Sequence, residues 1–139
     1  MKKYLVIGNP IDHSLSPKLH NYWIKKNKID AIYEKKLLIK GDLEKTISKL
    51  KLGEIDGINV TVPFKNTVIS YIDELSEEAK KTQSVNTIYM KYNKIIEGTT
   101  PPAPKIRTFF PNTLYLKCLN PNSKPAISVL CPMVLLFLK

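Results

Sequence analysis

Cysteine, arginine and glycine are scarce in this 139-residue chain, and each shortage excludes a class of protein. The two cysteines, Cys118 and Cys131, are too few for a disulfide framework and lack the spacing of a metal site. Arg107 is the single arginine among 22 basic residues, although arginine is the preferred residue for phosphate forks and base contacts. The net charge of +10 is spread over scattered lysines, so it indicates a solvated surface rather than a nucleic-acid-binding one.

Long apolar runs and glycine-rich loops are also missing. The five glycines form no GxGxxG pattern, which leaves no loop to cradle a dinucleotide pyrophosphate. The first apolar run, Tyr4–Ile7, is too short for a signal peptide, and the last, Ala126–Leu138, is broken by Pro132 and too short to span a bilayer. We therefore expect a cytoplasmic protein with neither nucleic acid nor membrane as a partner.

Strand-like and helix-like segments alternate in the first 98 residues, which predicts an α/β fold with a mostly parallel, mixed sheet flanked by helices. We expect strands at Tyr4–Ile7, Ala31–Ile39 and Gly57–Val62, and a hairpin of Ser84–Tyr92 with Lys94–Ile96 that turns at Asn93. We expect helices capped by Ser16 and Asp42, the first facing the core with Leu19, Tyr22 and Trp23, and short helices at Asn66–Ile72 and Ser76–Lys81.

The composition changes sharply at Glu97. Seven of the ten prolines, both cysteines and the single arginine follow it, and no acidic residue does. We predict a folded domain over residues 1–98 and an irregular Pro-rich tail over residues 99–139. A linker and tail, a swapped domain or translation out of frame would each explain the change. The nucleotide sequence around codon 98 would distinguish them.

Two polar clusters follow strands of the predicted sheet. Ser14 and Ser16 follow the first strand, while Asn59, Thr61 and Lys65 alternate with apolar residues along and beyond the third. Because ligands of such sheets bind at the carboxyl ends of strands, the clusters can meet at one edge. Hydroxyl groups near a helix start suit a carboxylate, although Ser16 has the alternative role of a helix cap.

Lys65 and the neutral amide and hydroxyl side chains of the same region suit a polyhydroxylated ligand. Asn59, Thr61 and Asn86 offer short donors and acceptors for ring hydroxyls, or else ordinary turn and strand-edge hydrogen bonds. Lys65 is either a general acid/base or one of many surface lysines. We interpret His20 as structural, packed on its helix, and assign no role to His13.

The segments GNPIDHSLSPKLHN, GINVTVPFK and SVNT occur in this order, and the chain resembles the substrate-binding domain of shikimate dehydrogenase over about residues 3–98. Intact members of that family reduce 3-dehydroshikimate to shikimate with NADPH, in chorismate and aromatic amino-acid biosynthesis. The resemblance implies that Ser14 and Ser16 hold the substrate carboxylate and that Lys65 handles the reacting proton. It also implies that Asn86 contacts a ring hydroxyl, with Thr61 in the same pocket.

Two departures from the family pattern limit what this chain is expected to do. The family continues with Gly-x-Asn-Thr-Asp, whereas Gly98 is followed here by Thr99-Thr100-Pro101-Pro102, so Pro102 replaces the aspartate that partners the lysine. The family's Gly-rich cofactor domain has no counterpart in the sequence. We expect a truncated or frame-disrupted shikimate dehydrogenase that binds the substrate but not NADPH, and that is inactive alone.

Two other functions fit the sequence. The chain could be a non-catalytic binding module for shikimate-like carboxylates, which assays of turnover with added NADPH would distinguish from an enzyme. It could also be a basic interaction protein anchored by Ala126–Leu138, which membrane fractionation would test.

Overall fold

A computed structural model describes residues 1–39 and 41–98 of the chain. The predictions for residues 99–139, including the irregular tail and the replacement at Pro102, lie outside the described residues. The elements run in the order β1 (Lys2–Gly8), α1 (Ser16–Lys26), β2 (Ala31–Leu37), α2 (Asp42–Lys51), β3 (Gly57–Val60), α3 (Phe64–Thr67), the 3₁₀ helix η1 (Val68–Tyr71), α4 (Glu77–Thr82), β4 (Thr87–Lys91) and β5 (Lys94–Glu97).

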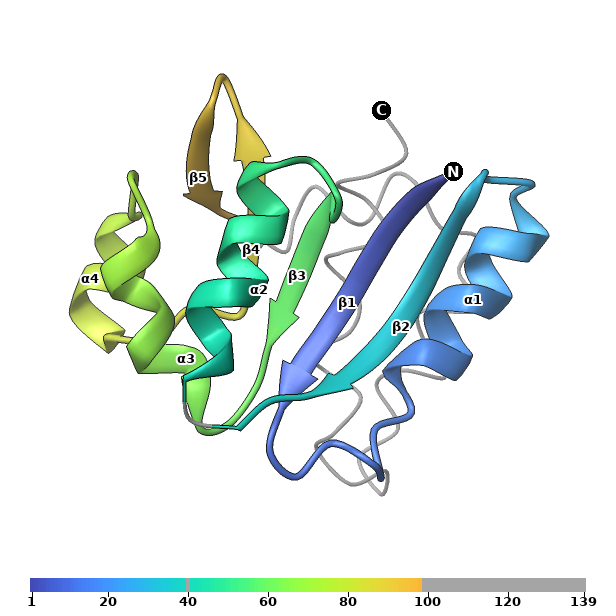
Figure 1. Cartoon of the computed structure of the whole chain (residues 1–139), viewed down its shortest axis with the longest axis horizontal. Helices are drawn as coiled ribbons and strands as arrows, with labels where there is room; N and C mark the ends of the chain where they lie inside the picture. The colour runs from blue at the N-terminus through green and yellow to red at the C-terminus, as the bar shows by residue number, and fades with distance from the viewer. Residues whose placement is uncertain (40, 99–139) are drawn as a thin grey trace, which may run out of the picture. The chain divides into compact units, whose positions relative to one another are not determined.

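The strands form one mixed sheet with the order β2-β1-β3-β4-β5 (Figure 1). Strand β1 lies at the centre of the parallel part, between β2 and β3. Strand β4 runs antiparallel to both β3 and β5, so the parallel share of the sheet is smaller than we expected. The mixed α/β sheet is confirmed, and so is the hairpin turn, where Tyr92 and Asn93 adopt positive φ values of 49° and 62°.

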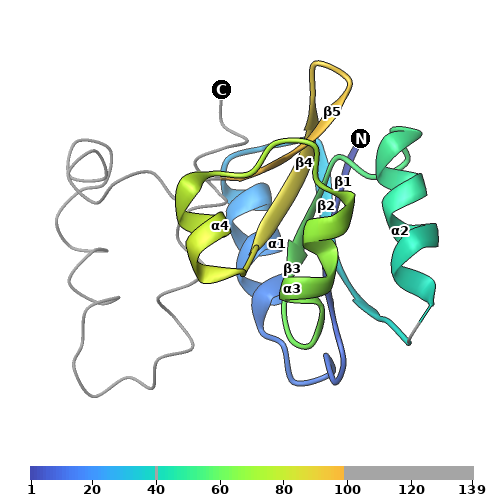
Figure 2. The same cartoon turned by 90° about the vertical axis from the view of Figure 1, so that its left-hand side faces the viewer.

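The helices cover the two faces of the sheet unequally. In Figure 2, α1 and α2 lie on opposite sides of the strands. The face toward α2 holds one apolar cluster, which also takes side chains from α3, η1 and α4. Its members are Leu5, Ile7, Leu38, Leu43, Ile47, Leu50, Ile55, Ile58, Val60, Phe64, Val68, Ala79, Val85, Ile88 and Ile95. This cluster is the hydrophobic core of residues 1–98.

Helix starts and one helix face differ from the sequence-based expectations. Helix α1 has Leu15 at its N-cap and α2 has Gly41, with φ of 104°, so Ser16 and Asp42 are the first helical residues and not caps. Neither start has a side-chain cap bond, and a cap can shift by one residue without changing the apolar pattern. Tyr22 is 57% exposed, because α1 lies against the edge strand β2 and buries only a narrow stripe of its own side chains.

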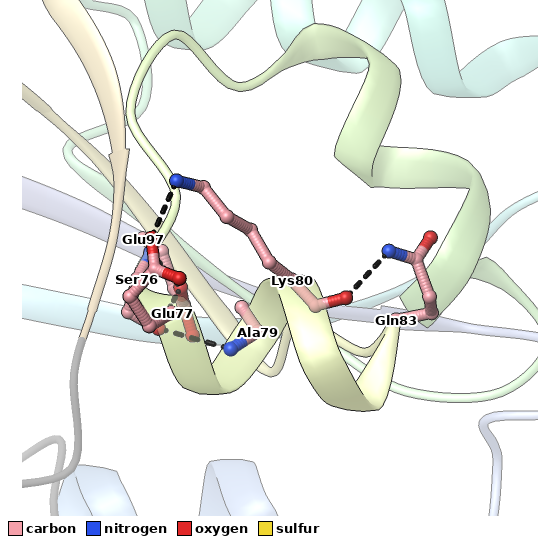
Figure 3. A network of polar contacts seen from close by, with 6 residues as sticks. All are labelled: Ser76, Glu77, Ala79, Lys80, Gln83 and Glu97. Carbon is pink, nitrogen blue, oxygen red and sulfur yellow. Dashed lines mark hydrogen bonds and ion pairs between the residues drawn. The ribbon is translucent and has the colours of Figure 1, made fainter.

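A polar network around α4 fixes Glu97, the last residue of β5 (Figure 3). The Glu97 carboxylate accepts hydrogen bonds from the backbone N–H of Ser76, at 3.2 Å, and from its hydroxyl, at 2.9 Å. The Ser76 oxygen in turn accepts from the N–H of Ala79 and caps α4. The Gly98 N–H donates to the Thr87 carbonyl at 2.9 Å, so the chain leaves β5 beside the first residue of β4. No helix within the described ranges is long and apolar enough to cross a membrane.

Candidate functional site

The carboxyl ends of the parallel strands share one edge of the sheet, and the loop that carries Ser14 follows β1 there (Figure 1). The Ser14 N–H closes a turn onto the Ile11 carbonyl at 3.0 Å. The Ser14 hydroxyl oxygen accepts from the Ser16 N–H at 3.4 Å. Helix α1 begins at Ser16 and has no acidic residue in its first turn, so no side chain of that turn neutralises its positive N-terminal end beside these two half-buried serines. The arrangement suits an anion.

Three contacts fix this serine loop against the sheet. The Asn9 N–H donates to the Val62 carbonyl at 3.0 Å, and the Asn9 side-chain amide donates to the Leu38 carbonyl at 2.9 Å. The Lys35 ammonium donates to the Asp12 carbonyl at 2.7 Å. At Gly8 a Cβ atom would lie 2.4 Å from the Thr61 methyl group, so only glycine allows this close approach of the loop to the residues after β3.

Thr61 and Lys65 lie beyond β3, not on it. The prediction of a strand through Val62 was wrong, because β3 ends at Val60 and the chain turns before α3 begins. The turn keeps Thr61 at the edge: its N–H donates to the Ile7 carbonyl at 3.0 Å, and its own carbonyl accepts from the Phe64 N–H at 3.0 Å. Lys65 is half-buried in α3, and among the described residues its ammonium group has neither a hydrogen bond nor an ion pair.

Asn86 reaches the same edge because β4 runs antiparallel to β3. Its carbonyl accepts from the Val60 N–H at 2.8 Å, and the Val85 N–H donates to the Lys65 carbonyl at 3.1 Å. The side chain of Asn86 is exposed. These backbone hydrogen bonds place Thr61, Lys65 and Asn86 at the same edge of the sheet. The serine loop, residues 9–15, lies beside them because the Asn9 N–H at its start donates to the Val62 carbonyl. No hydrogen bond between described residues links Ser14 or Ser16 directly to the other three.

The side chain of Asn59 is committed to the protein. Its Oδ1 atom accepts from the Tyr33 hydroxyl, and its Nδ2 atom donates to the Thr87 hydroxyl at 3.1 Å and to the Asn86 carbonyl at 3.5 Å. One lone pair of Oδ1 is left for any ligand. Sequence reasoning assigned no role to Tyr33 or Thr87, because a tyrosine or threonine in a strand looks like ordinary sheet packing.

His20 lies behind this group on the α1 side of the sheet. The imidazole is 5% exposed and stacks on the Tyr33 ring, with the centroids 4.1 Å apart. Its Nε2 atom is buried without a hydrogen-bond partner among the described residues. Burial lowers the pKa of His20 to about 4 and raises that of the Tyr33 hydroxyl, so both side chains are neutral near pH 7. The interpretation of His20 as a packed residue agrees with these contacts.

The described residues offer neither a metal site nor a dinucleotide cradle. No group of three or more His, Cys, Asp or Glu side chains within them could hold a metal ion. Gly8 is the last residue of β1, where a Gly-rich loop would begin, but the space beside it is filled by Thr61 of the same chain. The described residues therefore form no Gly-rich phosphate-binding loop after β1.

Comparison with known proteins identifies the family of this chain. The family model of the shikimate dehydrogenase substrate-binding domain matches residues 6–88. The shikimate dehydrogenase (NADP(+)) of Pelagibacter ubique is 61% identical over 99 residues, which are 71% of this chain and 37% of that protein. The chain thus spans little more than a third of this curated relative.

Two solved structures agree in fold. The shikimate dehydrogenase 1 of Peptoclostridium difficile has a TM-score of 0.66 and 34% identity, over 72% of this chain and 38% of its own. The shikimate 5-dehydrogenase of Listeria monocytogenes, solved in complex with shikimate and NAD, has a TM-score of 0.68 and 27% identity, over 77% of this chain and 37% of its own. The family model matches more than half of the chain, and with these relatives it shows that the chain belongs to the shikimate dehydrogenase substrate-binding domain family.

Proposed function

We propose that residues 1–98 form the substrate-binding half of a shikimate dehydrogenase, which holds shikimate or 3-dehydroshikimate at the carboxyl edge of the sheet. The observation that carries the proposal is the convergence of Thr61, Lys65 and Asn86 through backbone hydrogen bonds beside the fixed serine loop. A small, anionic, polyhydroxylated ring is the kind of ligand that matches hydroxyl, amide and ammonium groups placed in this way.

Each side chain has a distinct part in this proposal. Ser14 and Ser16 donate to the ring carboxylate, supported by the N-terminal end of α1. Asn86 and Thr61 bond ring hydroxyls, and the remaining Oδ1 lone pair of Asn59 accepts one more hydrogen bond at most. Lys65 holds the proton of the hydroxyl or carbonyl that reacts in intact members of the family, because its ammonium group has no partner among the described residues.

The cofactor marks the limit of this proposal. The curated relatives are named shikimate dehydrogenase (NADP(+)), but the described residues form no Gly-rich phosphate-binding loop, so we assign no hydride transfer to them. A cytoplasmic location, as the sequence indicates, completes the proposal. We expect the chain alone to show no NADPH-dependent turnover of shikimate, with the Pelagibacter relative as the positive control.

A chimera tests the residue roles. Residues 99–139 are replaced by the remainder of the Pelagibacter relative, which restores a cofactor domain. In an active chimera, Lys65→Ala should lower kcat by about 10²- to 10⁴-fold with little change in KM, since it removes a proton-handling group. Ser14→Ala should mainly raise KM, because the carboxylate does not change during the reaction.

The control variant is Lys45→Ala, which removes an exposed lysine from α2 and should leave both constants unchanged. An active chimera that is indifferent to Lys65→Ala would remove Lys65 from the mechanism.

A further inference from the structure

A continuous line of buried and half-buried contacts runs from α1 to the start of β4, across the face of the sheet opposite the apolar core. It begins at His20, whose ring stacks on Tyr33. It continues through the Tyr33 hydroxyl to Asn59, and from the Asn59 amide to Thr87 and to the carbonyl of Asn86. Each link joins a different element of the fold, in the order α1, β2, β3 and β4.

Tyr33 is fixed at both its backbone and its side chain. Its N–H donates to Oδ1 of Asn21 at 3.0 Å, and its carbonyl accepts from Nδ2 of the same residue at 2.8 Å. The side chain is 2% exposed, so water does not compete for the hydroxyl. Because an amide oxygen can only accept, the Tyr33 hydroxyl is the donor in its bond to Asn59. Burial also raises the pKa of this hydroxyl, so it keeps its proton near pH 7.

The Tyr33 hydroxyl and the Asn86 carbonyl, which can only accept, together set the orientation of the Asn59 amide. With Oδ1 directed at Tyr33, the NH₂ group is directed at the Thr87 hydroxyl and the Asn86 carbonyl. In a rotated amide the Tyr33 hydroxyl would have to accept from the NH₂ group, and the amide oxygen would face the Asn86 carbonyl, where two acceptors repel one another. The Asn86 carbonyl already accepts from the Val60 N–H at 2.8 Å, so two donors from β3 fix the residue that precedes β4.

We propose that Tyr33 is a positioning residue for substrate binding, which acts through the Asn59 amide to fix the backbone of Asn86 and hence to place the exposed Asn86 side chain against a ring hydroxyl of the ligand. Tyr33 itself does not touch the ligand, because it is buried on β2, and two strands, β1 and β3, lie between β2 and β4. The identity of the ligand in this inference rests on the proposed function, whereas the series of hydrogen bonds from Tyr33 to Asn86 does not. The two are tested separately.

The test uses the full chain and the variant Tyr33→Phe, which removes the hydroxyl and keeps the ring that stacks on His20. Amide hydrogen exchange is the first measurement and needs no ligand. Loss of the donor frees the Asn59 amide, so we expect the Val60 N–H to exchange about tenfold faster, in line with the loss of one buried hydrogen bond. Tyr89→Phe is the matched control, because it removes a tyrosine hydroxyl from β4 outside this chain of contacts and should leave that rate unchanged.

Titration with shikimate is the second measurement. We expect Tyr33→Phe to weaken binding about tenfold in the otherwise native chain, but less than about twofold when Asn86 is already replaced by alanine. A merely structural role would instead weaken binding by the same factor in both backgrounds. Thr87→Val removes the hydroxyl that accepts from the Asn59 amide and keeps nearly the same side-chain volume. This variant should reproduce both results if Tyr33→Phe does not fold.

The outcomes separate the inference from the proposed function. If the native chain binds no shikimate, the proposed function fails, and the exchange rate of Val60 still decides whether Tyr33 fixes Asn86. An unchanged Val60 exchange rate in Tyr33→Phe or Thr87→Val overturns the inference. Equal loss of shikimate affinity with and without Asn86 overturns it as well, even if the proposed function holds.

Discussion

The two faces of the sheet differ in what they do for the protein. Along β1, Leu5 and Ile7 enter the apolar core, and along β3, Ile58 and Val60 do the same. Between the latter pair, Asn59 carries the polar chain of contacts on the opposite face. Because successive side chains of a strand point to opposite faces, the same strand contributes apolar residues to the core and polar residues to the binding edge. Substitutions on the two faces should therefore have separable effects.

The largest effect should come from the core face. Leu50 of α2 is fully buried, so Leu50→Ala should lower the free energy of unfolding by about 4 kcal/mol through lost burial and a residual cavity. Shikimate affinity of the folded fraction should stay within about twofold of the native value. Leu52→Ala is the control, since Leu52 follows the same helix at 75% exposure and should cost less than about 0.5 kcal/mol. Urea denaturation measures both, and equal losses would contradict the division between the faces.

The polar face should make stability depend on pH through His20. The unfolded chain binds this proton below about pH 6.5, whereas the folded chain binds it only below about pH 4, because burial lowers the pKa of His20. Stability from this residue is therefore complete above pH 6.5 and is lost as the pH falls toward 4. The loss by pH 4 should be roughly 3 kcal/mol, at up to about 1.4 kcal/mol per pH unit.

Denaturation curves between pH 7 and pH 4 measure this dependence. His20→Gln should remove this part of the slope, and His13→Gln, at the exposed and only other histidine, should retain it. Identical slopes in the two variants would show that the burial of His20 is not what makes the polar face sensitive to acid.

A smaller effect is expected at the loop that carries Ser14. The Lys35 ammonium bonds the Asp12 carbonyl at 2.7 Å in an exposed setting, so Lys35→Met should weaken shikimate binding by about two- to threefold and change stability by less than about 0.5 kcal/mol. Lys80→Met, which breaks a similarly exposed contact with Glu77 far from the loop, is the control and should leave binding unchanged. A loss of stability without a loss of affinity would assign Lys35 to the fold alone.

The sequence predicted the elements of this fold better than their ends. Strand β1 and the hairpin turn at Asn93 follow from local apolar runs and turn chemistry, which short-range physics decides. The end of β3 does not: Thr61 and Lys65 continue the alternation of the strand, but the turn at Thr61 takes them off it. The antiparallel course of β4 depends on how the chain returns through α3 and α4, which no local pattern encodes.

The candidate site divides in the same way. The serine loop and Lys65 could be proposed from the sequence because polar residues follow apolar strands in an order that resembles the family, and their roles stay predictions. Tyr33 was missed because its part depends on a hydrogen bond to a residue 26 positions away, on a strand that is not its neighbour. Asn59 was predicted as a ligand-binding residue and remains one only as a proposal, since most of its hydrogen-bonding capacity is used within the protein.

Titration of the full chain with shikimate, followed by backbone amide resonances, tests the central claim most directly. We predict saturable binding, with the largest shifts at Ser14, Ser16, Thr61, Lys65 and Asn86 and little change along α2. The methyl ester of shikimate, which lacks the carboxylate charge, should bind at least about tenfold more weakly, and Ser14→Ala should remove most of that preference. No saturable shifts at this edge of the sheet, or equal binding of the acid and its ester, would contradict the account.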